Sequence, residues 1–180
     1  MNIIETELAG LLIIDPMVFG DERGYFFESF NKRIFESAGL ETNFVQDNES
    51  KSSKGVLRGL HFQEPPHEQG KLVRVVSGAV MDISVDIRKG SSTYGKWEGI
   101  ELSAQNKRML WIPPGFAHGF VTLEEDTIFV YKCTRLYHKE SENAIIWNDP
   151  DLGIDWGIDD PVVSEKDQHA PAFKDLKSPF

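Results

Sequence analysis

The stretch AVMDISVDI, residues 79–87, predicts a β-strand because apolar and polar side chains alternate along it. One face is apolar and the other polar, with Met81, Ile83, Val85 and Ile87 on the first and Asp82, Ser84 and Asp86 on the second. Residues 127–137, TIFVYKCTRLY, alternate as well, and one parity holds Phe129, Tyr131, Cys133, Arg135 and Tyr137. Turn signals such as RKGSSTYG and PPGF separate short strands of this kind. The pattern predicts an antiparallel β-sandwich or barrel.

Helical periodicity is confined to short segments. Residues 30–40, FNKRIFESAGL, predict one helix with Asn31 as its N-cap and Gly39 as its end, and with Ile34, Phe35 and Ala38 on one side. Residues 164–171, SEKDQHAP, predict a helical turn capped by Ser164. We therefore expect one mainly β domain over residues 1–180, with irregular N-terminal strands in residues 1–45 and a C-terminal extension over residues 148–180.

The composition narrows the class of protein. The 180 residues carry a net charge of −10, which excludes a general nucleic-acid or anionic-membrane surface but leaves room for a small anionic ligand. Cys133 is the only cysteine, so no intrachain disulfide is expected. The N-terminus has no basic segment typical of a signal peptide, and no apolar run approaches the roughly 20 residues of a membrane span. We expect a soluble cytoplasmic protein.

The segment KGVLRGLHFQEPPHEQGKL, residues 54–72, is unusually polar for a β-strand. His61 and Gln63 share one parity, and Lys71 follows a loop that contains two prolines. A sheet face with so many hydrogen-bonding groups faces water or lines a pocket. Arg58 lies three residues before His61, so a regular strand places the two side chains on opposite faces. Either a bulge at Gly59 brings them together, or Arg58 serves another surface, such as a neighbouring subunit's pocket.

Residues 111–120, WIPPGFAHGF, resemble the second motif of the cupin barrels through Pro113, Gly115 and His118. Metal-dependent cupins have two histidines separated by one residue in their first motif. The corresponding positions here hold His61 and Gln63, and no nearby Asp, Glu or Cys completes a ligand set. We therefore expect no metal, and His118 to be a hydrogen-bonding residue of the wall.

Acid–base chemistry at His61 needs two further groups, an acid and a carboxylate that pairs with the ring. Tyr131 shares the inward parity with Cys133 and is a candidate acid, whereas Tyr137 fits an ordinary packing role with one hydroxyl hydrogen bond. A catalytic histidine needs a carboxylate on its second ring nitrogen, which fixes the tautomer and stabilises the imidazolium. Asp82, Asp86 and Asp167 all meet that requirement on chemistry alone.

Taken together, the motifs resemble the dTDP-4-dehydrorhamnose 3,5-epimerase family over nearly the whole chain. The resemblance is carried by DERGYFFESF, FVQDNESKSSKGVLRGLHFQ, PPHEQGKLVRVVSGAVMDISVDIRKGSSTYGKW, LWIPPGFAHGF, VYKCTRLY, IIWNDP and SEKD. It implies a cupin-like antiparallel jelly-roll, no metal or organic cofactor, and a homodimer with strands exchanged near the active sites. The implied reaction epimerises C3 and C5 of dTDP-4-dehydro-6-deoxy-D-glucose through enolate intermediates.

The resemblance also implies roles for individual residues. His61 is the implied base, Tyr131 the acid, Asp167 the carboxylate behind His61, and Lys71 the candidate for stabilising the enolate. The implied contacts to the nucleotide sugar come from Arg23, Glu28, Gln46, Asn48, Arg58, Lys71, His118, Glu142 and Lys166. The alternatives are a mono-epimerase or a 4-keto sugar isomerase in the same class, a metal-dependent cupin such as a dioxygenase, and a silent sugar-binding module.

Overall fold

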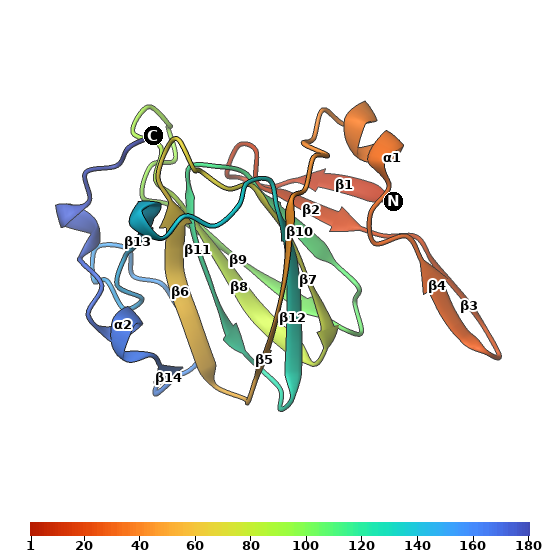
Figure 1. The fold of residues 1–180 in the computed structure, drawn as a ribbon. Coiled ribbons are helices and arrows are strands. Elements are labelled where there is room, and N and C mark those ends of the chain that lie inside the picture. Colours follow the sequence, from red (N-terminus) through yellow and green to blue (C-terminus); the bar gives the residue numbers. More distant parts are fainter.

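The computed structural model describes residues 1–180 and consists mainly of β-strands (Figure 1). The strands are β1 (Asn2–Glu5), β2 (Leu12–Asp15), β3 (Val18–Asp21), β4 (Gly24–Phe27), β5 (Gln46–Ser52), β6 (Val56–Gln63), β7 (Lys71–Ser77), β8 (Ala79–Asp86), β9 (Trp97–Ser103), β10 (Met109–Ile112), β11 (Phe116–Thr122), β12 (Thr127–Cys133), β13 (Glu142–Ala144) and β14 (Val162–Val163). The α-helices are α1 (Lys32–Ser37) and α2 (Glu165–Gln168), and two 3-10 turns span Lys139–Ser141 and Phe173–Asp175. No helix has the length and apolar character needed to cross a membrane.

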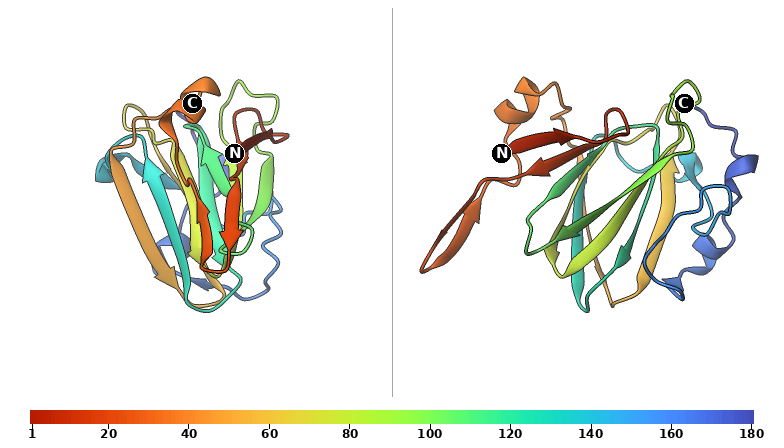
Figure 2. Two further views of the ribbon diagram at one scale, coloured as in Figure 1. Left: turned by 90° about the vertical axis from the view of Figure 1, so that its right-hand side faces the viewer. Right: turned by 180° about the vertical axis from the view of Figure 1, so that it is seen from behind.

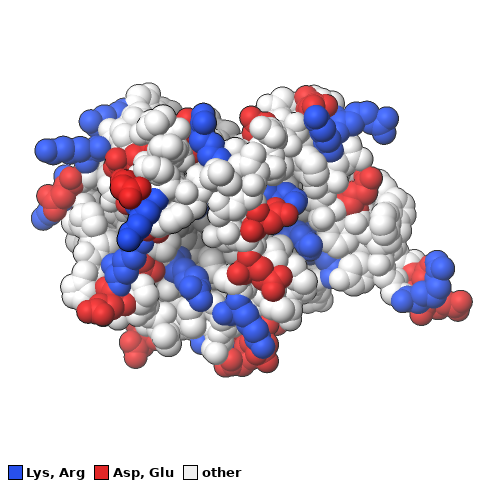
Figure 3. Space-filling view, in the orientation of Figure 1, with Lys and Arg blue, Asp and Glu red and all other residues white.

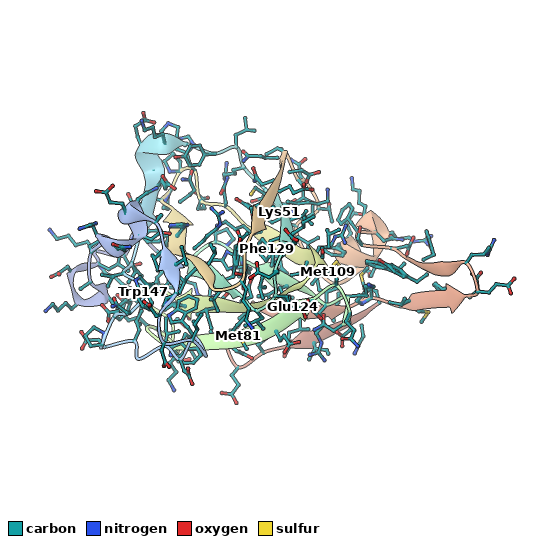
Figure 4. All side chains as sticks on the ribbon, turned by 90° about the horizontal axis from the view of Figure 1, so that it is seen from below. Lys51, Met81, Met109, Glu124, Phe129 and Trp147 are labelled. Carbon is teal, nitrogen blue, oxygen red and sulfur yellow. The ribbon has the colours of Figure 1, made fainter.

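Two main sheets build the body of the molecule. The first has the strand order β1-β2-β10-β7-β12-β5, and the second has the order β13-β6-β11-β8-β9 with β14 added beside β6. All strand pairings are antiparallel except that of β14 with β6, which is parallel. The sheets face each other, and a cluster that includes Val73, Leu110, Phe129, Val80 and Phe120 fills the space between them (Figures 1 and 4). The predicted mainly β fold with a few short helices is confirmed.

Strand β8 is buried on both of its faces. Ile83 and Val85 pack outward, where residues 145–180 cover the second sheet, and Val80 points into the space between the sheets (Figure 2). Asp82 and Ser84 share the inner face with Val80 and are completely buried. The predicted polar face of residues 79–87 therefore lines the interior of the barrel rather than facing water.

The two predicted helical segments form. Asn31 accepts a hydrogen bond from the Ile34 N–H, Phe35 is buried, and Gly39 adopts the left-handed conformation that ends α1. The prediction that Ala38 lies on the buried side was wrong, because Ala38 is the exposed C-cap. Ser164 caps α2 by accepting from the Asp167 N–H.

Strand β12 is shorter than its alternating pattern predicts. It ends at Cys133, which pairs with the first residues of both neighbouring strands, Gln46 of β5 and Lys71 of β7. Beyond this point no strand continues on either side, so the chain leaves the sheet. Arg135 and Tyr137 are exposed loop residues, so their predicted place in the strand, on the same parity as Tyr131, was wrong.

The hairpin β3–β4 projects from the body (Figures 1 and 2). Four large apolar side chains around it are more than half exposed, namely Met17 at 61%, Phe19 at 58%, Tyr25 at 61% and Phe26 at 66%. Apolar patches of this kind on a small protein mark an interaction surface.

Asp86 at the end of β8 anchors the turn that follows, and its replacement by asparagine is expected to destabilise the protein at neutral pH. The side chain is fully buried, and burial alone would raise its pKa, but hydrogen bonds from Arg88, Ser91 and Thr93 lower it from 3.8 to about 2. A lowered pKa stabilises the fold above pH 4, and this contribution of about 2 kcal/mol is lost as the pH falls towards 2.

Urea denaturation of wild type and Asp86→Asn across this pH range measures the effect. The difference in unfolding free energy should shrink as the pH falls from 4 to 2. A difference that does not change with pH would contradict the assignment.

Candidate active site

A cavity of about 520 Å³ lies between the two sheets, next to β5, β6, β12 and the C-terminal segment. Eight of the residues expected at the site line it, namely Asn48, Arg58, His61, Lys71, His118, Tyr131, Lys166 and Asp167. On the face shown in Figure 3, basic and acidic side chains gather around a hollow between the sheets. The structure thus brings together residues separated by more than 100 positions in the sequence.

A distortion of β6 explains how Arg58 and His61 reach the same cavity. His61 pairs with His118 of β11 and Arg58 pairs with Phe120, so three steps along β6 match two along β11. Gly59 lies in this irregularity with a φ of 139°, and a Cβ there would come within 2.5 Å of the Gly119 Cα. Only glycine fits such a close approach of two backbones. Of the two alternatives left open by the sequence, the bulge is the one observed.

His61 forms a tight pair with Asp167. Its Nε2 lies 2.7 Å from Oδ1 of Asp167, a carboxylate that is almost completely buried. Burial alone would raise the pKa of Asp167, but the hydrogen bonds that its carboxylate accepts from His61 and the Gly59 N–H outweigh burial and lower it. An ionised Asp167 fixes the ring so that Nδ1 is free to accept a proton. The predicted carboxylate is therefore Asp167, not Asp82 or Asp86.

Tyr131 and Lys71 lie on the opposite wall, which the first sheet forms. Burial raises the pKa of Tyr131, so the phenol keeps its proton at neutral pH. Burial also lowers the pKa of Lys71, although Cys133, Asp82 and Glu142 partly offset this effect. The Lys71 Nζ lies 6.0 Å from the centre of the Tyr131 ring and forms no ion pair. A partly buried cation without a fixed partner is suited to a charge that develops on a bound molecule.

His118 belongs to a second histidine–carboxylate pair. Its Nε2 lies 3.0 and 2.9 Å from the two carboxylate oxygens of Asp82, which is completely buried. His118 is also the cross-strand partner of His61, so the two rings lie side by side on the inner face of the second sheet. The predicted hydrogen-bonding wall residue is in place.

Glu142 and Lys166 form an ion pair at the edge of the cavity, with Oε2 and Nζ 2.5 Å apart. The Tyr137 hydroxyl donates to the same carboxylate over 3.0 Å. Burial alone would raise the pKa of Glu142, but these two hydrogen bonds lower it. Tyr137 thus makes the one hydroxyl hydrogen bond expected of it, but it is half exposed rather than packed in the sheet.

Three predicted contact residues lie outside the cavity. Arg23 is exposed at the tip of the hairpin β3–β4, where it pairs with Asp21 at 2.5 Å, and Glu28 is exposed just after β4 and accepts from Asn31. Gln46, at the start of β5, accepts from the Tyr137 N–H. Within one chain, none of these three residues lines the cavity that contains His61.

Ser52 is a contact that the sequence did not suggest. Its Oγ accepts hydrogen bonds from Nε and Nη2 of Arg58 at 3.3 and 3.2 Å and so orients the guanidinium. Its strand, β5, has the sequence QDNESKS, which contains no apolar residue, so hydrophobic alternation did not reveal a strand. The available signal was the alternation of uncharged and charged side chains along the strand. Ser52 shares its parity with the uncharged Gln46, Asn48 and Ser50.

The chain offers no cluster suited to a metal. No group of three or more His, Cys, Asp or Glu side chains is placed to hold an ion. Gln63, which stands where metal-dependent cupins have their second histidine, is buried, and its Oε1 accepts from the His138 N–H. The donor set therefore does not fit a metal centre.

The model of the family described as dTDP-4-dehydrorhamnose 3,5-epimerase matches residues 5–175. The chain belongs to this family. An epimerase of that name from Shigella flexneri is 56% identical over 97% of both chains. The crystal structure of the Elizabethkingia anophelis enzyme superposes with a TM-score of 0.94 at 54% identity and covers 99% of this chain and 98% of its own.

A third relative carries a ligand. The Legionella pneumophila dTDP-6-deoxy-D-glucose-3,5-epimerase was solved in complex with dTDP-4-keto-L-rhamnose, and it matches with a TM-score of 0.93 and 51% identity over 97% of this chain and 94% of its own. The similarities span both sheets and the C-terminal segment, so they include every element that lines the cavity. The chain is accordingly an isomerase of the epimerase type with a cupin-like fold.

Proposed function

We propose that the protein epimerises C3 and C5 of dTDP-4-dehydro-6-deoxy-D-glucose and so forms dTDP-4-dehydro-L-rhamnose. The observation that carries the proposal is the His61–Asp167 pair on one wall of the cavity, facing Tyr131 and Lys71 on the other. The names of the relatives support the same substrate and the same double inversion.

The chemistry of the substrate explains why two walls are needed. The ketone at C4 acidifies the protons on both C3 and C5, because each carbanion is stabilised as an enolate. Inversion removes a proton from one face of the carbon and returns a proton to the other face. A base and an acid on opposite walls meet this requirement, whereas one group on one wall does not.

In the proposed cycle, Nδ1 of His61 takes the proton and Asp167 stabilises the imidazolium. The electron pair moves onto the C4 oxygen, and the ammonium of Lys71 stabilises the resulting enolate in a site shielded from water. The Tyr131 hydroxyl then delivers a proton from the other face as the ketone re-forms. Proton exchange with solvent resets both groups before the second carbon reacts.

The remaining side chains are proposed to bind the nucleotide. Arg58, oriented by Ser52, and Lys166 supply the cations that a diphosphate requires. Asn48 and His118 provide hydrogen bonds to the sugar. Glu142 holds Lys166 in position, and Gln46 orders the loop that carries Tyr137.

Arg23 and Glu28 are proposed to act in the cavity of a second copy. They lie on and beside the projecting hairpin, too exposed to serve the site of their own chain. The exposed Phe19, Tyr25 and Phe26 would be covered when the hairpin docks on the partner. We therefore propose a homodimer with exchanged strands.

A mixture of two inactive variants is expected to regain activity if the hairpin is exchanged. In a heterodimer of Arg23→Ala and His61→Ala subunits, one cavity contains an intact His61 and receives the intact hairpin of the other subunit. Random assembly of equal amounts should restore about a quarter of the wild-type activity. The variants are co-refolded and assayed below the KM. Activity no higher than the sum of the two separate variants would show that Arg23 serves its own chain.

Replacing Tyr131 with phenylalanine tests the two-sided mechanism against a mono-epimerase. His61 remains able to remove a proton, exchange it with D₂O and return deuterium to the same face. We expect deuterium incorporation to continue while formation of the L-configured product falls by about 10²-fold or more. NMR of the same sample measures both rates. Inversion at only one carbon by the wild type would favour the mono-epimerase, and an unchanged rate of inversion at both carbons in Tyr131→Phe would exclude Tyr131 as the acid.

A further inference from the structure

A second, narrow cavity lies at one end of the barrel, directly beside the active site. Phe180, Gln63 and Phe116 contribute to its wall. Lys71 and His118 line this cavity and also the large one, and no other residue lines both. Lys71 and His118 therefore separate the active site from the end of the barrel, and Phe180 lies on the far side of them.

The position of Phe180 is fixed by several contacts. The Lys89 N–H donates to its carbonyl over 3.1 Å, and its own N–H donates to the Ser178 Oγ over 3.2 Å. Ser178 is buried and donates in turn to the Ile87 carbonyl. The Phe180 ring meets Phe62 edge to face at 6.3 Å. The segment is held against the end of β8, and its ring is directed into the structure rather than towards solvent.

We propose that Phe180 is a positioning residue for Lys71 that closes the end of the barrel, so that water reaches the amine only through the substrate cavity. The contribution to catalysis rests on the proposed function, because Lys71 is assigned there to the enolate. The closure itself is a property of the fold and is independent of any substrate.

A closed end matters because Lys71 acts through its charge. Its stabilisation of an enolate weakens when water surrounds the amine, since water screens the interaction and must reorganise during the reaction. Burial is also the main reason why the pKa of Lys71 is lowered, so opening the end of the barrel should raise it. The titratable or charged groups around the two cavities, besides Lys71, are Glu49, Arg58, His61, Asp82, His118, Tyr131, Cys133, Glu142, Lys166 and Asp167.

The test compares Phe180→Ala with Phe173→Ala. Phe173 also belongs to the C-terminal segment and packs on the outer core, but it does not line the cavity beside Lys71. The pKa of Lys71 is measured by NMR titration of ¹³C-methylated lysines, with Lys71→Arg to assign the signal. We expect Phe180→Ala to raise this pKa by about 1 unit and to lower kcat about tenfold with little change in KM. Phe180→Leu should restore both values, and Phe173→Ala should change neither.

The outcomes test the closure by Phe180 separately from the proposed reaction. An unchanged Lys71 pKa in a folded Phe180→Ala protein, or an equal shift in Phe173→Ala, would show that Phe180 does not close the end of the barrel beside Lys71. If the wild type lacks epimerase activity, the proposed function fails, yet the titration still decides whether Phe180 controls access to Lys71. Phe180→Val opens a smaller gap and gives the same comparison if the alanine variant does not fold.

Discussion

Replacing His61 with alanine is expected to lower kcat by about 10²–10⁴-fold, the usual contribution of a positioned general base. The alanine variant has no group on that wall that can take the proton from C3 or C5. Tyr131 cannot substitute, because burial raises its pKa and keeps the phenol protonated. Binding should change little, since the cations proposed to hold the diphosphate are Arg58 and Lys166. The measurement is kcat and KM for product formation, with circular dichroism to confirm the fold.

Asp167→Asn is the matched control. The amide is isosteric with the carboxylate but does not stabilise an imidazolium, so kcat should fall while His61 stays in place. Because the pKa of Asp167 is lowered, the hydrogen bonds that its carboxylate accepts stabilise the fold above the pKa of an ordinary aspartate, and this contribution is lost as the pH falls through the lowered pKa. A His61→Ala protein that is folded and retains wild-type kcat would rule out His61 as the base.

Replacing Lys71 with methionine is expected to lower kcat by about 10²–10³-fold, the usual loss when one donor to a developing oxyanion is removed. Methionine has a similar length and no charge, so the enolate oxygen loses its cation. The same change removes a buried amine that has no ion pair, and the unfolding temperature should therefore stay the same or rise.

The pH profile of the wild type provides a second check on Lys71. The ammonium form is the active one, and its pKa is lowered by burial, so activity should decline at a lower alkaline pH than an ordinary lysine would cause. The alkaline decline should move in Lys71→Arg, whose guanidinium stays charged. A Lys71→Met protein with wild-type kcat would show that another group carries the enolate charge.

Much of the site followed from residue types alone. Alternation predicted that Tyr131 points inward and that Asp82 and Ser84 share one face, and Ser164 predicted the helical turn that positions Asp167. The bulge at Gly59 was one of two alternatives, because periodicity cannot show where a strand slips by one residue. The choice between the two alternatives depends on how closely the Gly119 backbone approaches Gly59, which only the folded structure shows.

Other features depend on neighbours that a local pattern does not contain. β5 escaped detection because its side chains are polar, and its pairing with β12 makes it a strand. β12 ends at Cys133 because both neighbouring strands stop there, whereas alternation in the sequence continues to Tyr137. In the proposed homodimer, the places of Arg23 and Glu28 depend on a second copy, so neither the sequence nor one chain fixes them.

The most direct test is proton NMR of dTDP-4-dehydro-6-deoxy-D-glucose with the purified protein in D₂O, with and without a chelator. We expect loss of both the C3 and the C5 proton signals, insensitivity to the chelator, and an L-rhamnose-configured product that a reductase can trap. Exchange at one carbon alone would make the protein a mono-epimerase. Binding without exchange at either carbon would contradict the account and leave a sugar-nucleotide binding protein.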